Sequence, residues 1–581
     1  MVDRKTASFM RSLCMGQIVE DIVLPFPELA ASDKETLEGV FGTIAQLLGP
    51  READLKKWDR AGELPAEFVS ELRAAGLFSF VVPEEHGGLG FGSKAYSRAL
   101  QEVAKYDASV AVTVGAHSSI GMRGLLLFGT EAQRARYYEK LASGEMIAAF
   151  CLTEPSSGSD AASIKTTAVK ERDAWVLNGN KIWITNGGIA DFFTVFAKTT
   201  APDERKGLSA FIVTRDMPGV STGPHEDKLG IRASSTTTVS FDNVRVPFDH
   251  LLGEEGKGFK VAMNILNSGR TGLGGGAVGG MKKLIQLATQ QANQRVQFDK
   301  PIREFGLVKQ KVGQMVIDCY ATEATVTMVA GLTDGGYGDY AVEAAISKVF
   351  ASEALWRTSD EALQIAAGNG YMTEFPYERL LRDSRINRIF EGTNDILRLF
   401  IALTAMNDVG TNLRDVSKSL EGVFNDPIKG FGVISEYALR RAAFATGIGR
   451  EGTTFTKLSP ALKTAQGVFE DCTRDLAAAT DRILRKHGRA IIEKQFATRR
   501  LADIMIDLFV LACVLSRVDA SIRKNGESGA AREIDIASAF AGQARRRVKH
   551  TVTEIDDNQD EHVKSLADLA FESERYGFDV L

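Results

Sequence analysis

Cysteine is scarce in this chain of 581 residues, and no two cysteines form a CxxC pair. The five stand far apart in the sequence, at Cys14, Cys151, Cys319, Cys472 and Cys513. An odd number of isolated cysteines excludes a disulfide framework and a cysteine-rich zinc site. The seven histidines show no HExxH motif or other clustered ligand spacing, so the sequence makes no case for a metal.

The sequence also lacks an excess of positive charge and a long apolar run. Lys and Arg number 70 against 75 Asp and Glu, so no overall basic field draws the chain to nucleic acid. The longest apolar run, Leu508 to Leu515, is too short to span a bilayer core of about 30 Å. The first twenty residues contain no apolar stretch of the kind a secretory signal needs. We therefore expect a cytoplasmic protein of bacterial type, a prediction that extends to a peripheral position at the inner membrane, with the matrix face of the mitochondrial inner membrane as the alternative.

What is present is a globular composition, with 44% hydrophobic and 25% charged residues, arranged in helical and β regions. Apolar residues recur every three or four positions except in a middle region, where the period is two and turn residues are frequent. We predict an α+β fold that is mainly α, with a middle β domain of the antiparallel barrel or sandwich type. The expected divisions are an N-terminal extension (1–32), a helical domain (33–147), the β domain (148–253), a helical bundle (254–407), a linker (408–459) and an additional helical domain (460–581).

Within the β region, Asn-Gly pairs predict turns. Asn178-Gly179 separates Trp175–Leu177 from Lys181–Thr185, which favours a hairpin at this point. Thr236–Phe241 and Val244–Val246 are expected as two further strands.

Two glycine-rich runs imitate nucleotide-binding loops. Gly274–Gly279 matches GxGxxG, but it follows residues with helical spacing and not a strand. We interpret its small residues as positions of close helix packing. Gly87–Lys94 has glycines at P-loop spacing but lacks the final GK[ST], so phosphoryl transfer receives no support.

Two segments of the β region suit a planar ring with a phosphate tail. Phe150–Asp160 joins an extended stretch to a turn rich in hydroxyls and backbone N–H donors. Trp183 and Thr185 stand on alternate positions of one expected strand, which would point both side chains the same way. Taken singly, such a turn is usually only a turn, and a Trp in a sheet usually belongs to the core.

A third segment, Arg382–Arg398, contains Glu391 just before a helix that opens at Thr393. Alone, Glu391 would be a carboxylate favoured by the dipole of that helix. Taken in order, the three segments resemble the acyl-CoA dehydrogenase family, in which the Glu of a Phe/Tyr-Glu-Gly-Thr stretch is the catalytic base. The likeness runs from about Leu24 to the C-terminus. The 190 residues after Glu391 resemble the very-long-chain branch, because shorter-chain members end soon after this segment.

The resemblance implies an N-terminal helical domain, a middle β domain, a C-terminal four-helix bundle and an extra C-terminal helical domain. It also implies FAD as cofactor, held between the middle domain and the bundle, and a homodimer whose second subunit reaches the FAD. Glu391 is implied to be the catalytic residue. The implied FAD contacts are Phe150, Leu152, Thr153, Ser159, Trp183, Thr185, Arg295, Phe298, Gln364, Gly368, Thr393 and Asp395. The implied substrate contacts are Ser159, Asn267, Arg270, Phe390 and Gly392.

Several of these positions have individual roles in the family pattern. Thr153 and Thr185 would bond the polar edge of the flavin, Trp183 would cover one flavin face, and Arg295 with Phe298 would meet FAD from the neighbouring subunit. Ala367 departs from the family's glycine in the turn after Gln364.

The implied reaction is α,β-dehydrogenation of an acyl-CoA thioester to a trans-2-enoyl-CoA, with electrons passed to an electron-transfer flavoprotein. Glu391 would take the α-proton, and its backbone N–H with a flavin ribityl hydroxyl would stabilise the developing oxyanion. Ala111 and Gly115 are small residues one helical turn apart. By resemblance they leave the acyl channel open for chains of roughly twelve carbons or more, with ordinary helix packing as the alternative.

Residues 427–460 carry five basic and two acidic side chains together with apolar surface. They resemble the membrane-docking segment of long-chain members, with a surface loop as the alternative. Two other functions compete with the dehydrogenase. One is an acyl-CoA oxidase that reacts with oxygen, and the other is a flavin-containing assembly or scaffold protein with this fold.

Overall fold

The fold is described from a computed structural model of the chain. The described residues are 3–199, 207–407, 409 and 452–580. They divide into two compact units: a larger one, Asp3–Thr6 with Pro27–Ile396, and a smaller one, whose described parts are Ala7–Phe26 and the residues from Leu397 onward. Each unit is described by itself.

The larger unit begins with helices packed around the core that contains Phe78, Leu100 and Leu125. Asp107 caps the helix that follows it by accepting a hydrogen bond from the Val110 N–H. Thr130 and Gln133 form a capping box at the start of α8. These helices are α2 (Ala31–Leu48), α3 (Glu52–Ala61), α4 (Ala66–Ala74), α5 (Ser93–Tyr106), α6 (Ala108–Gly115), a π-helical turn (Ala116–Gly121), α7 (Arg123–Phe128) and α8 (Glu131–Ala142).

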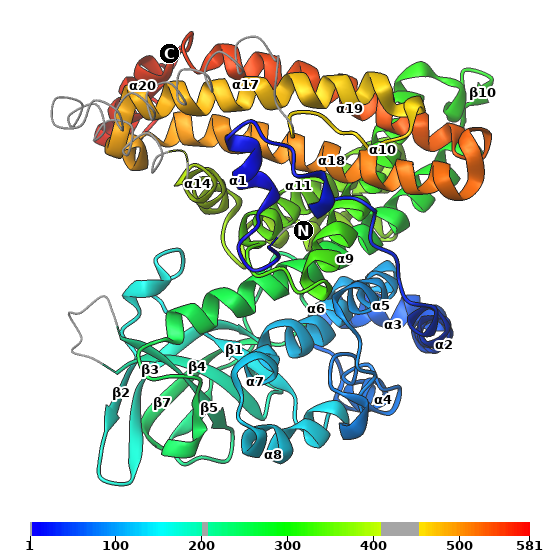
Figure 1. The fold of residues 1–581 in the computed structure, drawn as a ribbon. Coiled ribbons are helices and arrows are strands. Elements are labelled where there is room, and N and C mark those ends of the chain that lie inside the picture. Colours follow the sequence, from blue (N-terminus) through cyan, green and yellow to red (C-terminus); the bar gives the residue numbers. More distant parts are fainter. Residues whose placement is uncertain (1–2, 200–206, 408, 410–451, 581) are drawn as a thin grey trace, which may run out of the picture. The chain divides into compact units, whose positions relative to one another are not determined.

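The middle of the larger unit is a twisted β-sheet (Figure 1) with strand order β6-β7-β3-β2-β4-β5-β8. Its pairings are antiparallel except that β1 and β2 each pair parallel with β4. Trp175, Phe193 and Phe211 are buried in its core. The strands are β1 (Ala148–Cys151), β2 (Thr167–Lys170), β3 (Ala174–Thr185), β4 (Phe192–Lys198), β5 (Leu208–Thr214), β6 (Val220–Thr222), β7 (Thr236–Pro247) and β8 (Leu251–Leu252).

The predicted hairpin at Asn178-Gly179 is wrong, because β3 runs straight through it. The register of β3 on β7 shifts between Leu177 and Gly179, so the glycine serves a bulge and not a reversal. Gly179 has φ of 151°, and a Cβ there would lie 2.4 Å from Thr166 Oγ1. The expected break between residues 241 and 244 is the other side of this bulge, where Asp242 and Asn243 of β7 lie opposite Asn178 of β3 and Asn243 donates its backbone N–H to Asn178 Oδ1 at 2.9 Å.

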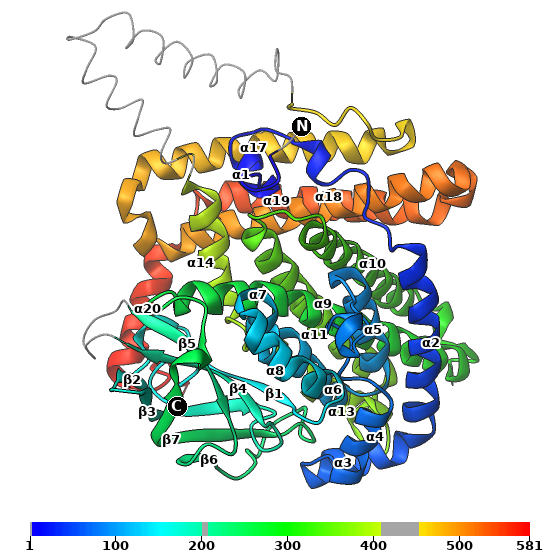
Figure 2. The same ribbon diagram turned by 60° about the horizontal axis from the view of Figure 1, so that its bottom comes forward.

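A bundle of long helices completes the larger unit. In Figure 2, α5, α9, α10 and α11 lie side by side. The elements after the sheet are α9 (Gly258–Gln294), the short pair β9 (Val296–Gln297) and β10 (Lys300–Pro301), α10 (Gly306–Asp334), α11 (Ala341–Ala366), α12 (Gly368–Tyr371), α13 (Tyr377–Arg385) and the start of α14 (Asn394–Ala405), whose residues from Leu397 onward belong to the smaller unit.

The interpretation of Gly274–Gly279 as a helix-packing run is confirmed, since the run lies inside the 37-residue helix α9. A Cβ at Gly275 would lie 2.7 Å from the Ser97 carbonyl oxygen, and one at Gly279 would lie 2.1 Å from that of Gln101. The missing side chains therefore let α9 approach the backbone of α5.

The smaller unit is helical. Its long helices α17, α18 and α19 pack against one another, and α1 packs on α17. The Phe9 ring of α1 lies 6.3 Å from that of Phe469 and 6.2 Å from that of Phe509. The helices are α1 (Phe9–Cys14), α17 (Lys463–His487), α18 (Gln495–Gly529), α19 (Ala531–Glu554) and α20 (Asp560–Ser573).

Two described segments are long and apolar enough to cross a membrane by length and composition: Ala108–Phe128 and Gly306–Asp334. Their most apolar windows are 72% and 67% buried inside the fold. Such burial is the pattern of core helices.

Candidate active site

Glu391 lies in a tight turn between α13 and α14. Its φ is 56°, and that of the following Gly392 is 92°. A non-glycine residue in the left-handed region is disfavoured and persists only where its surroundings hold it. Thr393 then caps the N-terminus of α14, because its Oγ1 accepts the Ile396 N–H at 3.2 Å.

The turn is held from α11 by a lysine that the sequence interpretation missed. Lys348 is fully buried, and its Nζ donates to the Gly392 carbonyl oxygen and to Asn394 Oδ1, each at 2.8 Å. Burial lowers the pKa of Lys348 to about 7. The only sequence signal was a cation within the otherwise apolar and small stretch Ala344–Phe350.

The carboxylate of Glu391 faces α9. A Cβ added to Gly269 would lie 3.2 Å from Glu391 Oε2 and 3.4 Å from Oε1, so the glycine leaves the room that the carboxylate occupies. Oε2 is buried and has no hydrogen-bond partner among the described residues. Burial raises the pKa of Glu391 to about 7, opposed by the charges of Arg270 and Lys348. Such a group can take up a proton near neutral pH.

Of the two predicted substrate contacts on this stretch of α9, Arg270 acts on the carboxylate, and Asn267 is the hydrogen-bond partner of Arg270. Arg270 is buried, donates through Nη1 to Asn267 Oδ1 at 2.8 Å, and interacts electrostatically with Glu391. Burial lowers the pKa of Arg270 to about 10. Phe390 and Gly392 flank Glu391 in the turn, and both are partly exposed.

Gly115 approaches the same region through Tyr96 of α5. The Tyr96 hydroxyl donates to the Gly115 carbonyl oxygen at 3.4 Å, and burial raises the tyrosine's pKa, with a further increase from the charge of Glu391. Ala111 lies one turn earlier on α6 and is buried in the N-terminal core.

The first two motif segments of the β region meet through a buried ion pair. Lys181 Nζ lies 2.8 Å from Glu154 Oε1 and donates to the Leu152 carbonyl oxygen at 3.2 Å. One residue on, the Ile182 N–H donates to the Thr153 carbonyl oxygen at 3.0 Å. Sequence reasoning did not single out Lys181 or Glu154, because a lysine in a strand gives no sign of burial.

Trp183 departs from the simple strand alternation that we expected. Its φ is 57°, and the register of β3 on β7 shifts between Lys181 and Ile184. The bulge turns the indole outward, so that Trp183 is 61% exposed, while Thr185 and Thr153 are partly exposed. Phe150 is partly buried against Phe196, with ring centroids 5.1 Å apart.

Leu152 is buried, whereas most of the other predicted cofactor contacts are on the surface. Phe298 is 87% exposed at the tip between β9 and β10, with φ of 52°. Ala367, which replaces the family's glycine, adopts φ of 53° at the end of α11. Exposed side chains or backbone are also found at Ser159, Arg295, Gln364, Gly368 and Asp395.

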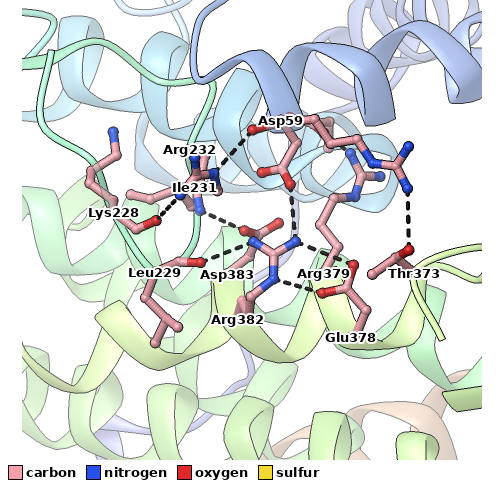
Figure 3. A network of polar contacts seen from close by, with 12 residues as sticks. Asp59, Lys228, Leu229, Ile231, Arg232, Thr373, Glu378, Arg379, Arg382 and Asp383 are labelled. Carbon is pink, nitrogen blue, oxygen red and sulfur yellow. Dashed lines mark hydrogen bonds and ion pairs between the residues drawn. The ribbon is translucent and has the colours of Figure 1, made fainter. Parts of the chain in front are cut away.

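A polar network fixes helix α13, which leads into the Glu391 turn (Figure 3). Arg382 of α13 donates to Asp59 Oδ2 of α3 and to the Leu229 carbonyl oxygen, each at 3.0 Å. Asp383 accepts the Ile231 N–H at 2.5 Å, and burial raises the pKa of Asp383 to about 7. One helix is thus tied to both the N-terminal helices and the loop before β7.

Comparison with known proteins agrees with this arrangement of helices, sheet and helices. Residues 45–145, 149–244 and 256–406 match the profiles described as the N-terminal, middle and C-terminal domains of acyl-CoA dehydrogenase. Residues 460–576 match the profile described as the ACAD9/ACADV C-terminal domain. The chain belongs to the acyl-CoA dehydrogenase family, and the predicted fold class is confirmed.

Three relatives show how far the similarity extends. The mitochondrial very long-chain specific acyl-CoA dehydrogenase of Bos taurus is 41% identical over 97% of this chain and 87% of its own length. An acyl-CoA dehydrogenase of Bacillus anthracis, solved in complex with FAD, is 31% identical with a TM-score of 0.80, over 99% of this chain and 97% of its own. Butyryl-CoA dehydrogenase of Megasphaera elsdenii is 36% identical with a TM-score of 0.63, and its whole chain corresponds to 66% of this one.

Proposed function

We propose that this protein is an FAD-dependent acyl-CoA dehydrogenase that converts long- or very-long-chain acyl-CoA thioesters to trans-2-enoyl-CoA in fatty acid β-oxidation. One observation carries the proposal: in a chain of this family, the Glu391 carboxylate has a buried oxygen with no hydrogen-bond partner in the described part of the chain, and its pKa is raised to about 7. A carboxylate with these two properties is suited to act as a general base near neutral pH.

The residues present fit a flavin. Trp183 is 61% exposed on its strand, and an exposed indole is a surface on which a planar ring stacks. Two partly exposed hydroxyl residues are close to it: Thr185 is two residues further along β3, and the carbonyl oxygen of Thr153 accepts the N–H of Ile182, the residue before Trp183. We assign the flavin ring to Trp183, Phe150, Leu152, Thr153 and Thr185. The FAD phosphates and adenosine fall to Ser159, Gln364, Gly368, Thr393, Asp395 and, from a second subunit, Arg295 and Phe298. FAD, when bound, supplies the acceptor for the β-hydrogen and its two electrons.

The chain's own residues handle the proton. Glu391 removes the α-proton of the thioester, and the C–H electron pair moves toward the thioester carbonyl, whose oxygen gains negative charge. The Glu391 backbone N–H donates to that oxygen. Gly269 leaves space beside the Glu391 carboxylate. The Arg270 guanidinium, which donates to Asn267, favours the ionised form of Glu391. Phe390 and Gly392 border the reacting carbons.

Chain length depends on the helix that carries Ala111 and Gly115. A Cβ at Gly115 would lie 3.4 Å from Leu100 Cδ2 and 3.9 Å from the Tyr96 oxygen, so a larger side chain there would press on these two side chains of α5. We propose that these small residues admit chains of about twelve carbons or more. Activity should peak at such substrates, and a profile that peaks at butyryl- or octanoyl-CoA would refute the open channel.

The proposed electron acceptor is an electron-transfer flavoprotein, and the proposed assembly is a homodimer. Oxygen consumption during turnover would identify the competing oxidase. FAD binding without reduction by any acyl-CoA would favour the scaffold role.

Relatives of this chain include mitochondrial and bacterial proteins. A cytoplasmic location at the inner membrane stays a prediction for this chain. Most of the predicted membrane-docking segment, 427–451, lies outside the described residues. Deletion of 427–451 should reduce co-sedimentation with anionic liposomes if this segment docks on the membrane.

A further inference from the structure

Lys348 is a buried cation in the middle of α11 whose hydrogen bonds go to uncharged acceptors. Its side chain is fully buried, and both hydrogen bonds of its Nζ go to uncharged oxygens. The two acceptors are the Gly392 carbonyl oxygen and Asn394 Oδ1, each at 2.8 Å. Both belong to the turn that carries Glu391. A lysine is costly to bury, so a role at this turn would account for its presence.

Asn394 extends the attachment on the other side. Its Nδ2 donates to Ser352 Oγ and to Glu353 Oε1 of α11, each at 3.0 Å. Helix α11 therefore holds the turn at two residues: at Gly392, before α14, and at Asn394, the first residue of α14. The side-chain amide of Asn394 is oriented by these bonds, with its oxygen toward Lys348.

The turn needs such a grip because its backbone is disfavoured. Glu391 is a non-glycine residue at φ of 56°, and Gly392 follows at 92°. A carbonyl oxygen held by an ammonium group fixes the peptide plane between Gly392 and Thr393. This limits the freedom of Gly392, the residue that follows Glu391, whose carboxylate oxygens lie beside Gly269.

The same ammonium group acts on the charge of Glu391. Burial raises the pKa of Glu391, and Arg270 and then Lys348 lower it. The charged groups that act on Lys348 are Glu391, Arg270, Glu353 and Arg388. The titration of Glu391 and Lys348 is therefore coupled.

We propose that Lys348 is the positioning residue of the Glu391 turn: it clamps Gly392 and Asn394 to α11 and supplies a positive charge that keeps the base ionised. The proposal rests on Glu391 being the base. Lys348 does not itself contact the reacting atoms.

The test compares Lys348→Met, Lys348→Arg and the matched control Lys311→Met, which removes a partly exposed lysine of α10 that pairs with Glu361 of α11. Each is purified with FAD, and kcat and KM for palmitoyl-CoA are measured against pH. We expect Lys348→Met to retain FAD and to lose at least tenfold in kcat at neutral pH, with KM little changed. The ascending limb of the plot of kcat against pH should move to higher pH by about one unit, because the positive charge that favours ionised Glu391 is gone. Lys348→Arg should restore most of the position of the limb, and Lys311→Met should match the wild type.

The proposal would be overturned if Lys348→Met had the wild-type kcat per bound FAD and if its kcat rose over the same pH range as that of the wild type. If Lys348→Met does not fold, Asn394→Leu serves in its place. This variant removes one acceptor and keeps the cation, so it should lower kcat without moving the limb, and unchanged kcat would again contradict the clamp. Glu391→Gln is measured in parallel. Its retention of turnover would reject the proposed function itself, whereas an inactive Glu391→Gln beside a normal Lys348→Met rejects only the role of Lys348.

Discussion

Two buried lysine–glutamate arrangements in the larger unit use the same residue types to opposite ends. In the β domain, Lys181 Nζ pairs directly with Glu154 Oε1 at 2.8 Å. The Glu154 carboxylate also accepts the Thr166 hydroxyl at 2.5 Å and the backbone N–H groups of Lys165 and Thr166. In the bundle, Lys348 binds the turn and not the carboxylate, and Glu391 Oε2 has no partner among the described residues.

The titration behaviour follows from these contacts. Burial pushes the pKa of Glu154 up, but the charge of Lys181 and the hydrogen bonds outweigh it and lower the pKa. Burial wins at Glu391, where the pKa rises to about 7. A fully bonded carboxylate therefore holds a fold together, whereas a buried carboxylate with an unfilled oxygen is suited to take a proton.

The largest expected effect is on turnover. Glu391→Gln keeps the shape of the side chain but cannot accept the α-proton, so kcat should fall by about 10³-fold or more while FAD remains bound. The matched control is Glu154→Gln, which should retain most of kcat per bound FAD. Equal losses of kcat in the two variants would erase the distinction between the two carboxylates.

Removing the structural cation should damage stability most. Lys181→Met leaves Glu154 buried without its counter-ion and should lower the free energy of unfolding by about 3–5 kcal/mol. Denaturant unfolding of the purified protein measures this. Lys311→Met, which breaks a partly exposed pair with Glu361, should cost about 1 kcal/mol or less. A Lys181 variant as stable as that control would contradict the structural role of the pair.

The raised pKa of Glu391 predicts a pH-dependent difference in stability. Because the folded-state pKa of about 7 exceeds the ordinary value of 4.5, the unfolded chain releases this proton first, and wild-type stability is lost as pH rises from about 4.5 through 7. Glu391→Gln removes this loss, so it should match the wild type near pH 4.5 and exceed it by about 2–3 kcal/mol at pH 8. A stability difference that is constant with pH would rule out the raised pKa.

The smallest expected effect concerns the room beside the base. Gly269→Ala places a Cβ 2.7 Å from Ile120 Cγ2 and 3.2 Å from Glu391 Oε2, which should cost about 1–2 kcal/mol of stability and lower kcat. Gly39→Ala on α2 is the control, since a Cβ there would meet nothing within 4 Å and should stabilise the helix by about 0.5–1 kcal/mol. Thermal unfolding and kcat of both variants are compared with the wild type. If Gly269→Ala behaved like the control, the carboxylate would not occupy the position described.

Much of the fold could be predicted from local patterns. The change from helical spacing to period two located the β region, and the preceding helical residues correctly placed Gly274–Gly279 inside a helix. The hairpin at Asn178-Gly179 failed because the same dipeptide suits a bulge, and only pairing with β7 decides between them. The outward direction of the Trp183 side chain likewise depends on a shift in the pairing of β3 with β7, which the local sequence does not show.

The site could be predicted only in part. The position of Glu391 followed from the resemblance of its segment to a family, but its environment did not. Lys348 lies 43 positions before Glu391 in sequence, and nothing local shows that its side chain is buried or that it reaches Gly392. Such contacts arise from the packing of α11 against the turn.

The most direct test follows the absorbance of the purified FAD protein under anaerobic conditions while palmitoyl-CoA is added, for the wild type and for Glu391→Gln. The account predicts that the flavin band of the wild type bleaches within the turnover time, while that of Glu391→Gln stays oxidised although the substrate binds. A wild-type flavin that remains oxidised, or a Glu391→Gln flavin that bleaches at the wild-type rate, would contradict the assignment of Glu391 as the base of an acyl-CoA dehydrogenase.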